Sequence, residues 1–100
     1  MNEAEIIAGA REILSDPKRW HKGGGFNEDH TAMCAVGAVV SASYPLRGSG
    51  RQAVMDAIYG LLQSHTPDRD PVSIYNDKPS TTHPDILAVF DKTLADLGAL

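Results

Sequence analysis

Residues 31–43 read TAMCAVGAVVSAS and carry no charged side chain. Thr31 is a favourable N-cap, so we expect a helix that begins there and runs to about Ser43. A helix that is apolar on every side is normally buried, and Ala and Gly residues let neighbouring helices approach closely. The stretch is also too short to span a membrane. We therefore predict that it forms the central helix of the fold.

Three further helices are predicted around this element, because apolar residues recur at helical spacing. The first covers residues 3–14 and the next residues 51–64. The last has the clearest start signal, since Thr82 can cap it and Asp85 occupies the capping-box position near the positive helix end. Gly98 is a suitable stop for this helix. No strand pattern of comparable strength occurs in the sequence.

The segments between these helices are long and polar. Pro17 can start one further turn that reaches Trp20, and Gly23–Gly25 mark a loop with wide conformational freedom. Residues 65–81 are rich in Pro, Asp and Ser, and such long loops are often functional or mobile. We expect an all-α, compact single domain over residues 1–100, with about four helices around the small-residue helix and long loops.

Composition narrows the class of protein. The chain has 100 residues, of which 42% are apolar and 22% charged, as in an ordinary globular domain. Its net charge of −4 makes nucleic acid an unlikely partner, because affinity for phosphate backbones comes largely from Lys and Arg. The single cysteine excludes an internal disulfide and fits a reducing compartment. With no membrane-length apolar run and no secretory signal pattern, we expect a cytoplasmic protein.

Cys34, His83 and Asn76 form a candidate catalytic set. A helix N-terminus stabilises a nearby thiolate, and a histidine oriented by an asparagine can then act as its base. Folding has to bring the three residues together. The alternative is structural, because free cysteine is among the most buried residue types, while His83 and Asn76 suit a helix first turn and an Asx turn. The sequence favours the structural roles.

A metal site is a second possibility. His30 and Cys34 are four residues apart, so they would share a helix face if the helix started one turn early. His21, Asp29 or His83 can supply further zinc ligands in space. Zinc motifs usually bring two close ligand pairs, and this chain has one. The glycine run also lacks the Gly-Lys-Ser/Thr ending of a phosphate loop. We therefore predict no metal and no cofactor.

Two segments supply candidate binding residues. Lys18 and Arg19 stand beside Trp20, a pattern that can bind phosphates or stack a base; alternatively Trp20 anchors the segment on the core while the cations face water. The second segment is Tyr75, Asn76 and Asp77. Here Ile74 and Tyr75 are the substantial apolar residues in a polar stretch. Either they pin the loop to the core, or they form an exposed rim typical of a partner-binding hot spot.

Several short motifs occur in a suggestive order. They are Trp20, the Gly23–Gly25 loop, Cys34-Ala-Val-Gly37-Ala38, Tyr75-Asn76-Asp77, Thr82-His83 and Phe90-Asp91. Together they resemble a family of small uncharacterised proteins of actinobacteria and their bacteriophages, over about residues 10–95. Members of that family often carry Trp where this chain has Tyr75. The resemblance implies a setting and supplies no mechanism.

These observations lead to a ranked expectation of function. Since no nucleotide, cofactor or strong metal motif is present, we expect a non-enzymatic interaction or adaptor protein with a protein partner, phage-encoded and acting on a host component. The alternative is a small cysteine-dependent hydrolase or transferase that uses Cys34 with His83. A third hypothesis places a nucleic acid or phosphorylated ligand on the Trp20 patch.

Overall fold

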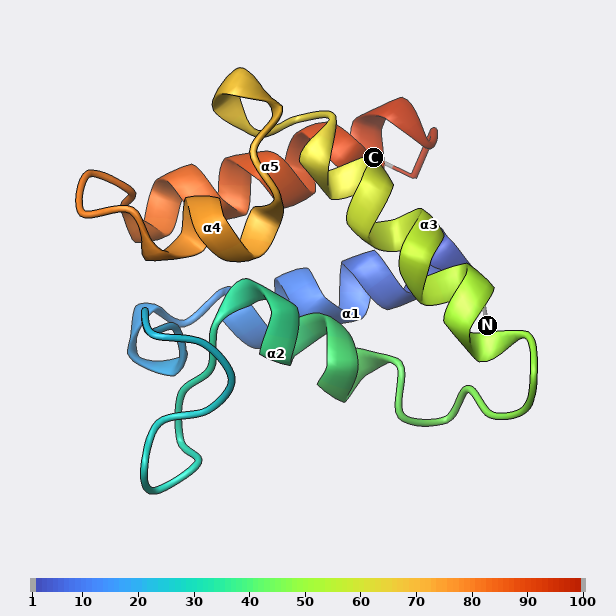
Figure 1. Ribbon diagram of the computed structural model, residues 1–100, viewed down its shortest axis with the longest axis horizontal. Coiled ribbons are helices and arrows are strands. Elements are labelled where there is room, and N and C mark those ends of the chain that lie inside the picture. Colours follow the sequence, from blue (N-terminus) through green and yellow to red (C-terminus); the bar gives the residue numbers. More distant parts are fainter. Residues whose placement is uncertain (1, 100) are drawn as a thin grey trace.

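Helix α1 begins directly behind Asn2, whose side chain and that of Glu5 cap each other's backbone amides at 2.9 and 3.1 Å. In the computed structural model, which describes residues 2–99, five α-helices and two 3-10 turns follow one another (Figure 1). They are α1 (Glu3–Leu14), a 3-10 turn (Pro17–Arg19), α2 (Ala35–Ala42), α3 (Arg51–Gln63), a second 3-10 turn (Pro67–Arg69), α4 (Val72–Asp77) and α5 (His83–Asp96). These residues form no β-strand, and the predicted all-α class is confirmed.

Helix α2 starts later than the sequence predicts. Its N-cap is Cys34, so the predicted cap at Thr31 is wrong. The amide and hydroxyl of Thr31 instead bind the carboxylate of Asp29 at 3.3 and 2.7 Å. Met33 is extended and bridges Trp20 and Phe26. Because the Thr31 hydroxyl is already bound to Asp29 within the loop, it does not cap a helix that starts at this position.

The small residues of α2 allow the close approach that was predicted. A side-chain carbon built on Gly9 of α1 would lie 3.3 Å from the Cβ of Ala42. Helix α2 packs on α1 and α4, whereas α1 packs on α2, α3 and α5. The longer α1 therefore occupies the centre of the fold together with α2, because the eight residues of α2 are too few to cover three neighbours.

Helix α4 lies inside the predicted 65–81 loop, and the prediction of an irregular loop is wrong over these six residues. Val72 and Asn76 are four residues apart, so they share one helix face, and both are buried. Pro71 precedes the helix and accepts hydrogen bonds from the amides of Ile74 and Tyr75. A short helix with one buried face is difficult to recognise in so polar a segment.

Helices α3 and α5 lie where the sequence predicts them, with α3 one residue shorter. The capping box of Thr82 and Asp85 starts α5. At its end Gly98 adopts a φ of 72°, and the amide of Ala99 donates to Leu94 at 2.9 Å. This is the Schellman arrangement, for which glycine is the favoured residue.

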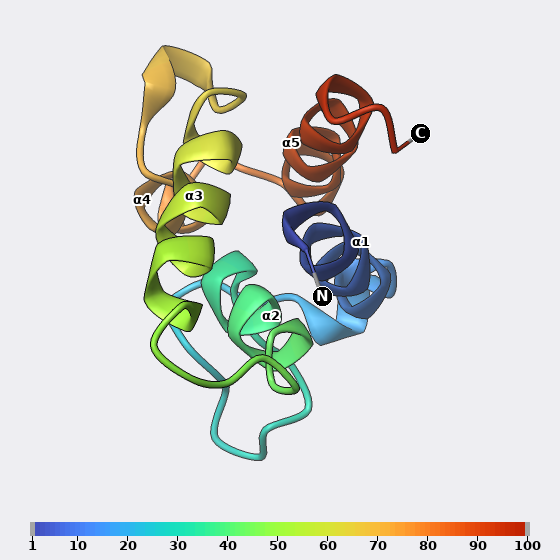
Figure 2. The ribbon, with the colours of Figure 1, turned by 90° about the vertical axis from the view of Figure 1, so that its right-hand side faces the viewer.

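All five helices contribute to one apolar core. Figure 2 shows α3 and α4 along one side and α1 and α5 along the other, with α2 between their lower ends. The core side chains are Ile6, Ile7, Ala10, Leu14, Met33, Ala35, Ala38, Val39, Met55, Ile58, Leu62, Val72, Ile86, Val89, Phe90 and Leu94. Over residues 2–99 no helix has the length and apolar run that crossing a membrane requires.

Candidate functional site

The side-chain amide of Asn76 joins three segments of the chain. Its Oδ1 accepts hydrogen bonds from the Trp20 indole at 2.7 Å and from the backbone amide of Ala35 at 3.0 Å. Its Nδ2 donates to the carbonyl of His21 at 3.2 Å and to the Asp77 carboxylate at 2.9 Å. Both Oδ1 partners are pure donors, so they fix the orientation of the amide. The Asn76 side chain is fully buried, and we call this arrangement the Asn76 junction.

The residues after Trp20 are fastened to the end of α4. The ammonium group of Lys22 donates to the carbonyls of residues 78 and 79, at 2.5 and 3.2 Å. The amide of Gly23 donates to the Asp77 carboxylate at 2.9 Å. This bond, followed by that from the Asn76 amide, lowers the pKa of Asp77. The carboxylate therefore stays ionised well into the acidic range and holds both segments.

The glycine loop, residues 23–32, leaves this fastened segment and crosses the start of α2. The carbonyl of Gly25 accepts the Cys34 amide at 2.9 Å and lies 3.2 Å from the His21 ring. A side-chain carbon on Gly37 would lie 3.0 Å from that same carbonyl oxygen. The crossing therefore depends on glycine at position 37, since any larger residue would push the loop outward.

The tip of the glycine loop presents two aromatic rings to solvent. Phe26 is 42% exposed, and its ring stacks on that of His30 with centroids 5.5 Å apart. His30 adopts a left-handed φ of 60°. The Asn27 side chain closes the loop by accepting the Ala32 amide at 3.0 Å. Sequence analysis missed this Phe26–His30 pair; the available signal was a lone aromatic within a Gly, Asn and Asp segment.

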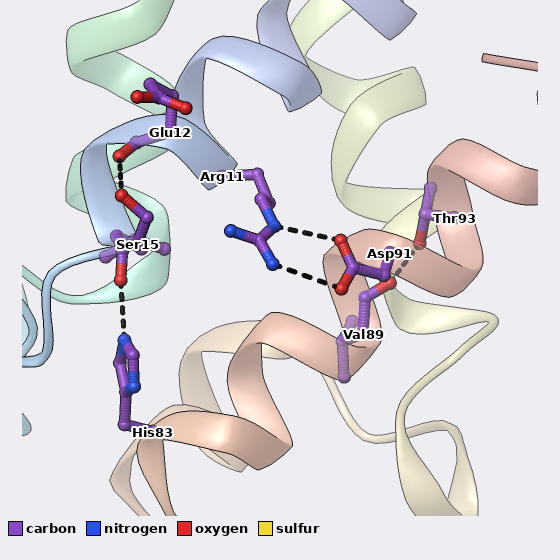
Figure 3. A network of polar contacts seen from close by, with 8 residues as sticks. Arg11, Glu12, Ser15, His83, Val89, Asp91 and Thr93 are labelled. Carbon is purple, nitrogen blue, oxygen red and sulfur yellow. Dashed lines mark hydrogen bonds and ion pairs between the residues drawn. The ribbon is translucent and has the colours of Figure 1, made fainter. Parts of the chain in front are cut away.

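Cys34, His83 and Asn76, the predicted catalytic residues, each form hydrogen bonds that hold the fold together. Cys34 is 3% exposed, and its Sγ accepts the amide of Gly37 at 3.3 Å, so it caps α2. His83 Nε2 lies 2.6 Å from the carbonyl of Leu14 at the end of α1 (Figure 3). Asn76 uses both of its side-chain polar atoms in the junction. Among residues 2–99, no hydrogen bond joins the thiol to His83 or Asn76.

His30 and Cys34 do not share a helix face, so the condition for a metal site at this pair is not met. The residues between them are not helical, because α2 starts only at Ala35. The ring of His30 instead faces Phe26. Within the described part of the chain, no group of three His, Cys, Asp or Glu side chains is close enough to hold a metal ion.

The predicted binding residues divide into buried and exposed ones. Trp20 is half-buried, with its ring 6.0 Å from that of His83, and so anchors its segment, while Lys18 and Arg19 are exposed on the adjacent 3-10 turn. Tyr75 is half-buried and packs against the core, whereas Ile74 is 56% exposed. Tyr75 thus pins the segment to the core, as the first alternative expected, and Ile74 is exposed, as the second alternative expected.

Comparison with known proteins gives a single finding. Residues 1–96 match the model of a family of unknown function (DUF6197). No curated protein and no solved structure matches the chain. The predicted resemblance to a family without a known activity is confirmed over nearly the whole chain, and the setting in actinobacteria and their phages stays a prediction.

Proposed function

We propose that this chain, which belongs to the family of unknown function DUF6197, is a non-enzymatic protein-interaction module that presents the Phe26–His30 pair to a protein partner. The observation that carries the proposal is the exposed aromatic pair on a loop whose base is fixed by the Asn76 junction. In the setting we infer, the module is a cytoplasmic adaptor encoded by a phage and acting on a host component.

Rigidity of the glycine loop supports a binding role. Ordering a loop at the moment of binding costs free energy, and a loop that is already ordered avoids this cost. Here Gly25 and Asn27 bind neighbouring backbone groups, so the loop is held at both ends before a partner arrives. Aromatic side chains also supply much of the binding energy in protein interfaces.

The charges at the loop tip indicate the chemistry of the partner. Glu28 and Asp29 lie between Phe26 and His30 in the sequence, and both are exposed. Hydrogen bonds from the Thr31 hydroxyl and amide lower the pKa of Asp29, so its carboxylate is ionised at neutral pH. A complementary partner offers an apolar pocket for Phe26 with basic groups around it. A phosphate backbone would be repelled by the same carboxylates.

The test is a tagged pull-down from host lysate, with and without nuclease, read by mass spectrometry. We compare the wild type with Phe26→Ala and with Ile74→Ala, which removes an exposed apolar side chain from α4. The proposal expects one nuclease-resistant partner that wild type and Ile74→Ala retain and that Phe26→Ala loses. Equal capture by Phe26→Ala, or no stoichiometric partner at all, contradicts it.

The cysteine-dependent alternative has less support. Chemistry at Cys34 needs an accessible thiol and a histidine directed at it. The thiol is 3% exposed, and the Nε2 atom of His83 is bound to the end of α1. A hydrolase or transferase using these two residues would therefore need a rearrangement of the start of α2.

A further inference from the structure

A hollow of about 410 Å³ is lined by residues of the end of α2, the start of α3 and the loop between them. This loop is green and lies at the lower right of Figure 1. The lining residues are Val40, Tyr44, Leu46, Arg47, Gly48 and Arg51. We propose that this hollow binds a phosphate monoester of a molecule that also carries a planar ring, as a nucleoside monophosphate does. The site lies outside the glycine loop and is independent of the proposed protein interaction.

Charge is the first argument for a phosphate. Arg47 and Arg51 are the ionisable groups that line the hollow along with the Tyr44 phenol, and no carboxylate lines it. Across residues 2–99 neither guanidinium forms an ion pair, although the chain as a whole carries a charge of −4. Guanidinium groups bind phosphate oxygens in bidentate geometry. Two unpaired cations around one hollow thus favour a doubly charged anion.

The Arg51 side chain is held in place before any ligand binds. Its Nη2 donates to the hydroxyl of Ser43 at 3.0 Å, and Ser43 is fully buried. The same hydroxyl donates to the carbonyl of Val40 at 2.8 Å, so its position is fixed by α2. A guanidinium anchored through one nitrogen keeps its other donors for an anion and loses little side-chain freedom on binding.

The planar ring is inferred from the remaining walls. Tyr44 is 70% exposed, the most exposed of the large apolar side chains in the described chain. Val40 and Leu46 line the same hollow, are half-buried and pack against the core. An exposed aromatic side chain next to apolar side chains offers a stacking surface for a flat ring system. A volume of about 410 Å³ suits a small ligand.

Binding is tested with the intact chain by following its amide resonances during titration with four probes. These are adenosine monophosphate, ribose phosphate, adenosine and inorganic phosphate. We expect saturable shifts confined to the loop between α2 and α3, with adenosine monophosphate binding most tightly. A phosphorylated dinucleotide, added as a fifth probe, distinguishes a free nucleotide from the end of a strand, and a free nucleotide site is expected to bind the dinucleotide no more tightly than adenosine monophosphate.

Variants separate the two halves of the site. Arg47→Gln should weaken binding of adenosine monophosphate roughly tenfold, since one charge-assisted hydrogen-bonding group is lost. Tyr44→Ala should reduce the affinity for adenosine monophosphate to that for ribose phosphate. Lys92→Gln removes the same charge from an exposed position on α5, outside the hollow, and should leave the affinity unchanged. Thermal unfolding confirms that each variant is folded.

Three results would overturn the proposal. One is the absence of saturable binding by either phosphate ester at millimolar concentration. Another is an equal loss of affinity in Lys92→Gln and Arg47→Gln, which would show a general charge effect. The third is equal affinity for adenosine monophosphate and ribose phosphate in the wild type, which would remove the planar ring.

Discussion

At the scale of single residues, Asn76 stands out because its fully buried side-chain amide needs a hydrogen-bond partner for each of its polar atoms. An amide buried without partners costs free energy, whereas one with every hydrogen bond made fixes a unique local structure. The partners of Asn76 come from Trp20, His21, Ala35 and Asp77, of which three lie 41 to 56 residues away in the chain. Asn76 thus helps to fix the segments on either side of the glycine loop, together with the Asp77 carboxylate that binds Gly23.

We predict that Asn76→Asp destabilises the fold by about 3 kcal/mol or more. The new carboxylate faces the carbonyl of His21 and the carboxylate of Asp77, where the amide now donates. Urea unfolding measures the loss, and emission from Trp20 reports the junction directly, since Trp20 is the only tryptophan. Asn27→Asp is the control: its acceptor role toward Ala32 is kept, so a change below about 1 kcal/mol is expected. Similar losses in both variants would refute this account.

A second prediction at this scale concerns the Cys34 thiol. Because it is buried and accepts a hydrogen bond from α2, alkylation of the native chain should proceed only as fast as the chain opens. Urea should therefore accelerate the reaction steeply. The reference is Ser49→Cys in a Cys34→Ala background, with an exposed thiol that reacts at once. Rapid alkylation of native Cys34 would favour the cysteine-dependent alternative.

The residue scale also shows what sequence reasoning can reach. Residue types identified Trp20, Asn76 and His83 as special, since they are costly to bury or useful in turns. Their partners could not be predicted, because these contacts join segments more than 50 residues apart and depend on how the helices pack. The roles of His83 at the end of α1 and of Asn76 in the junction are known only from the fold.

At the scale of elements, local signals predicted those helices that local interactions define. Helix α5 has a capping box and a glycine stop, and both function as predicted. Helix α4 was missed because it is stabilised by burial of Val72 and Asn76 rather than by propensity. The start of α2 was misplaced because Asp29 competes for the polar groups of Thr31.

A pair of glycines tests how α2 and the glycine loop fit together. Gly60 lies in α3 with open space beside it, so Gly60→Ala should stabilise the protein by about 0.5–1 kcal/mol. Gly37→Ala gains the same helix propensity but places its methyl group 3.0 Å from the Gly25 carbonyl oxygen. Overpacking should exceed the gain and leave a net loss of about 1 kcal/mol. Thermal unfolding compares the two; equal stabilisation would mean that the loop yields freely.

At the scale of the whole molecule, the shared core outweighs the few polar ties between helices. Arg11 of α1 binds Asp91 of α5 through two hydrogen bonds at 2.9 and 3.3 Å (Figure 3). Both side chains are partly exposed, and such pairs contribute about 0–1 kcal/mol. The buried side chains of all five helices form one cluster, so no helix has a core of its own.

A single core predicts a single unfolding transition. Helical circular dichroism reports all five helices, whereas emission from Trp20 reports the Asn76 junction. If the junction belongs to the common core, the two urea curves should coincide. A fluorescence transition at clearly lower urea would show instead that the glycine loop and α4 unfold as a separate unit.

The burial of the Asn76 amide also bears on how the protein ages. Asparagine is among the residues most prone to chemical decay, and deamidation turns it into the acid that the junction excludes. In the native chain its amide is enclosed and bound on every side, so this reaction is slow. In the unfolded chain that protection is gone. Deamidation at position 76 should therefore accumulate with the time that the chain spends unfolded, and the deamidated chains should refold to a less stable structure.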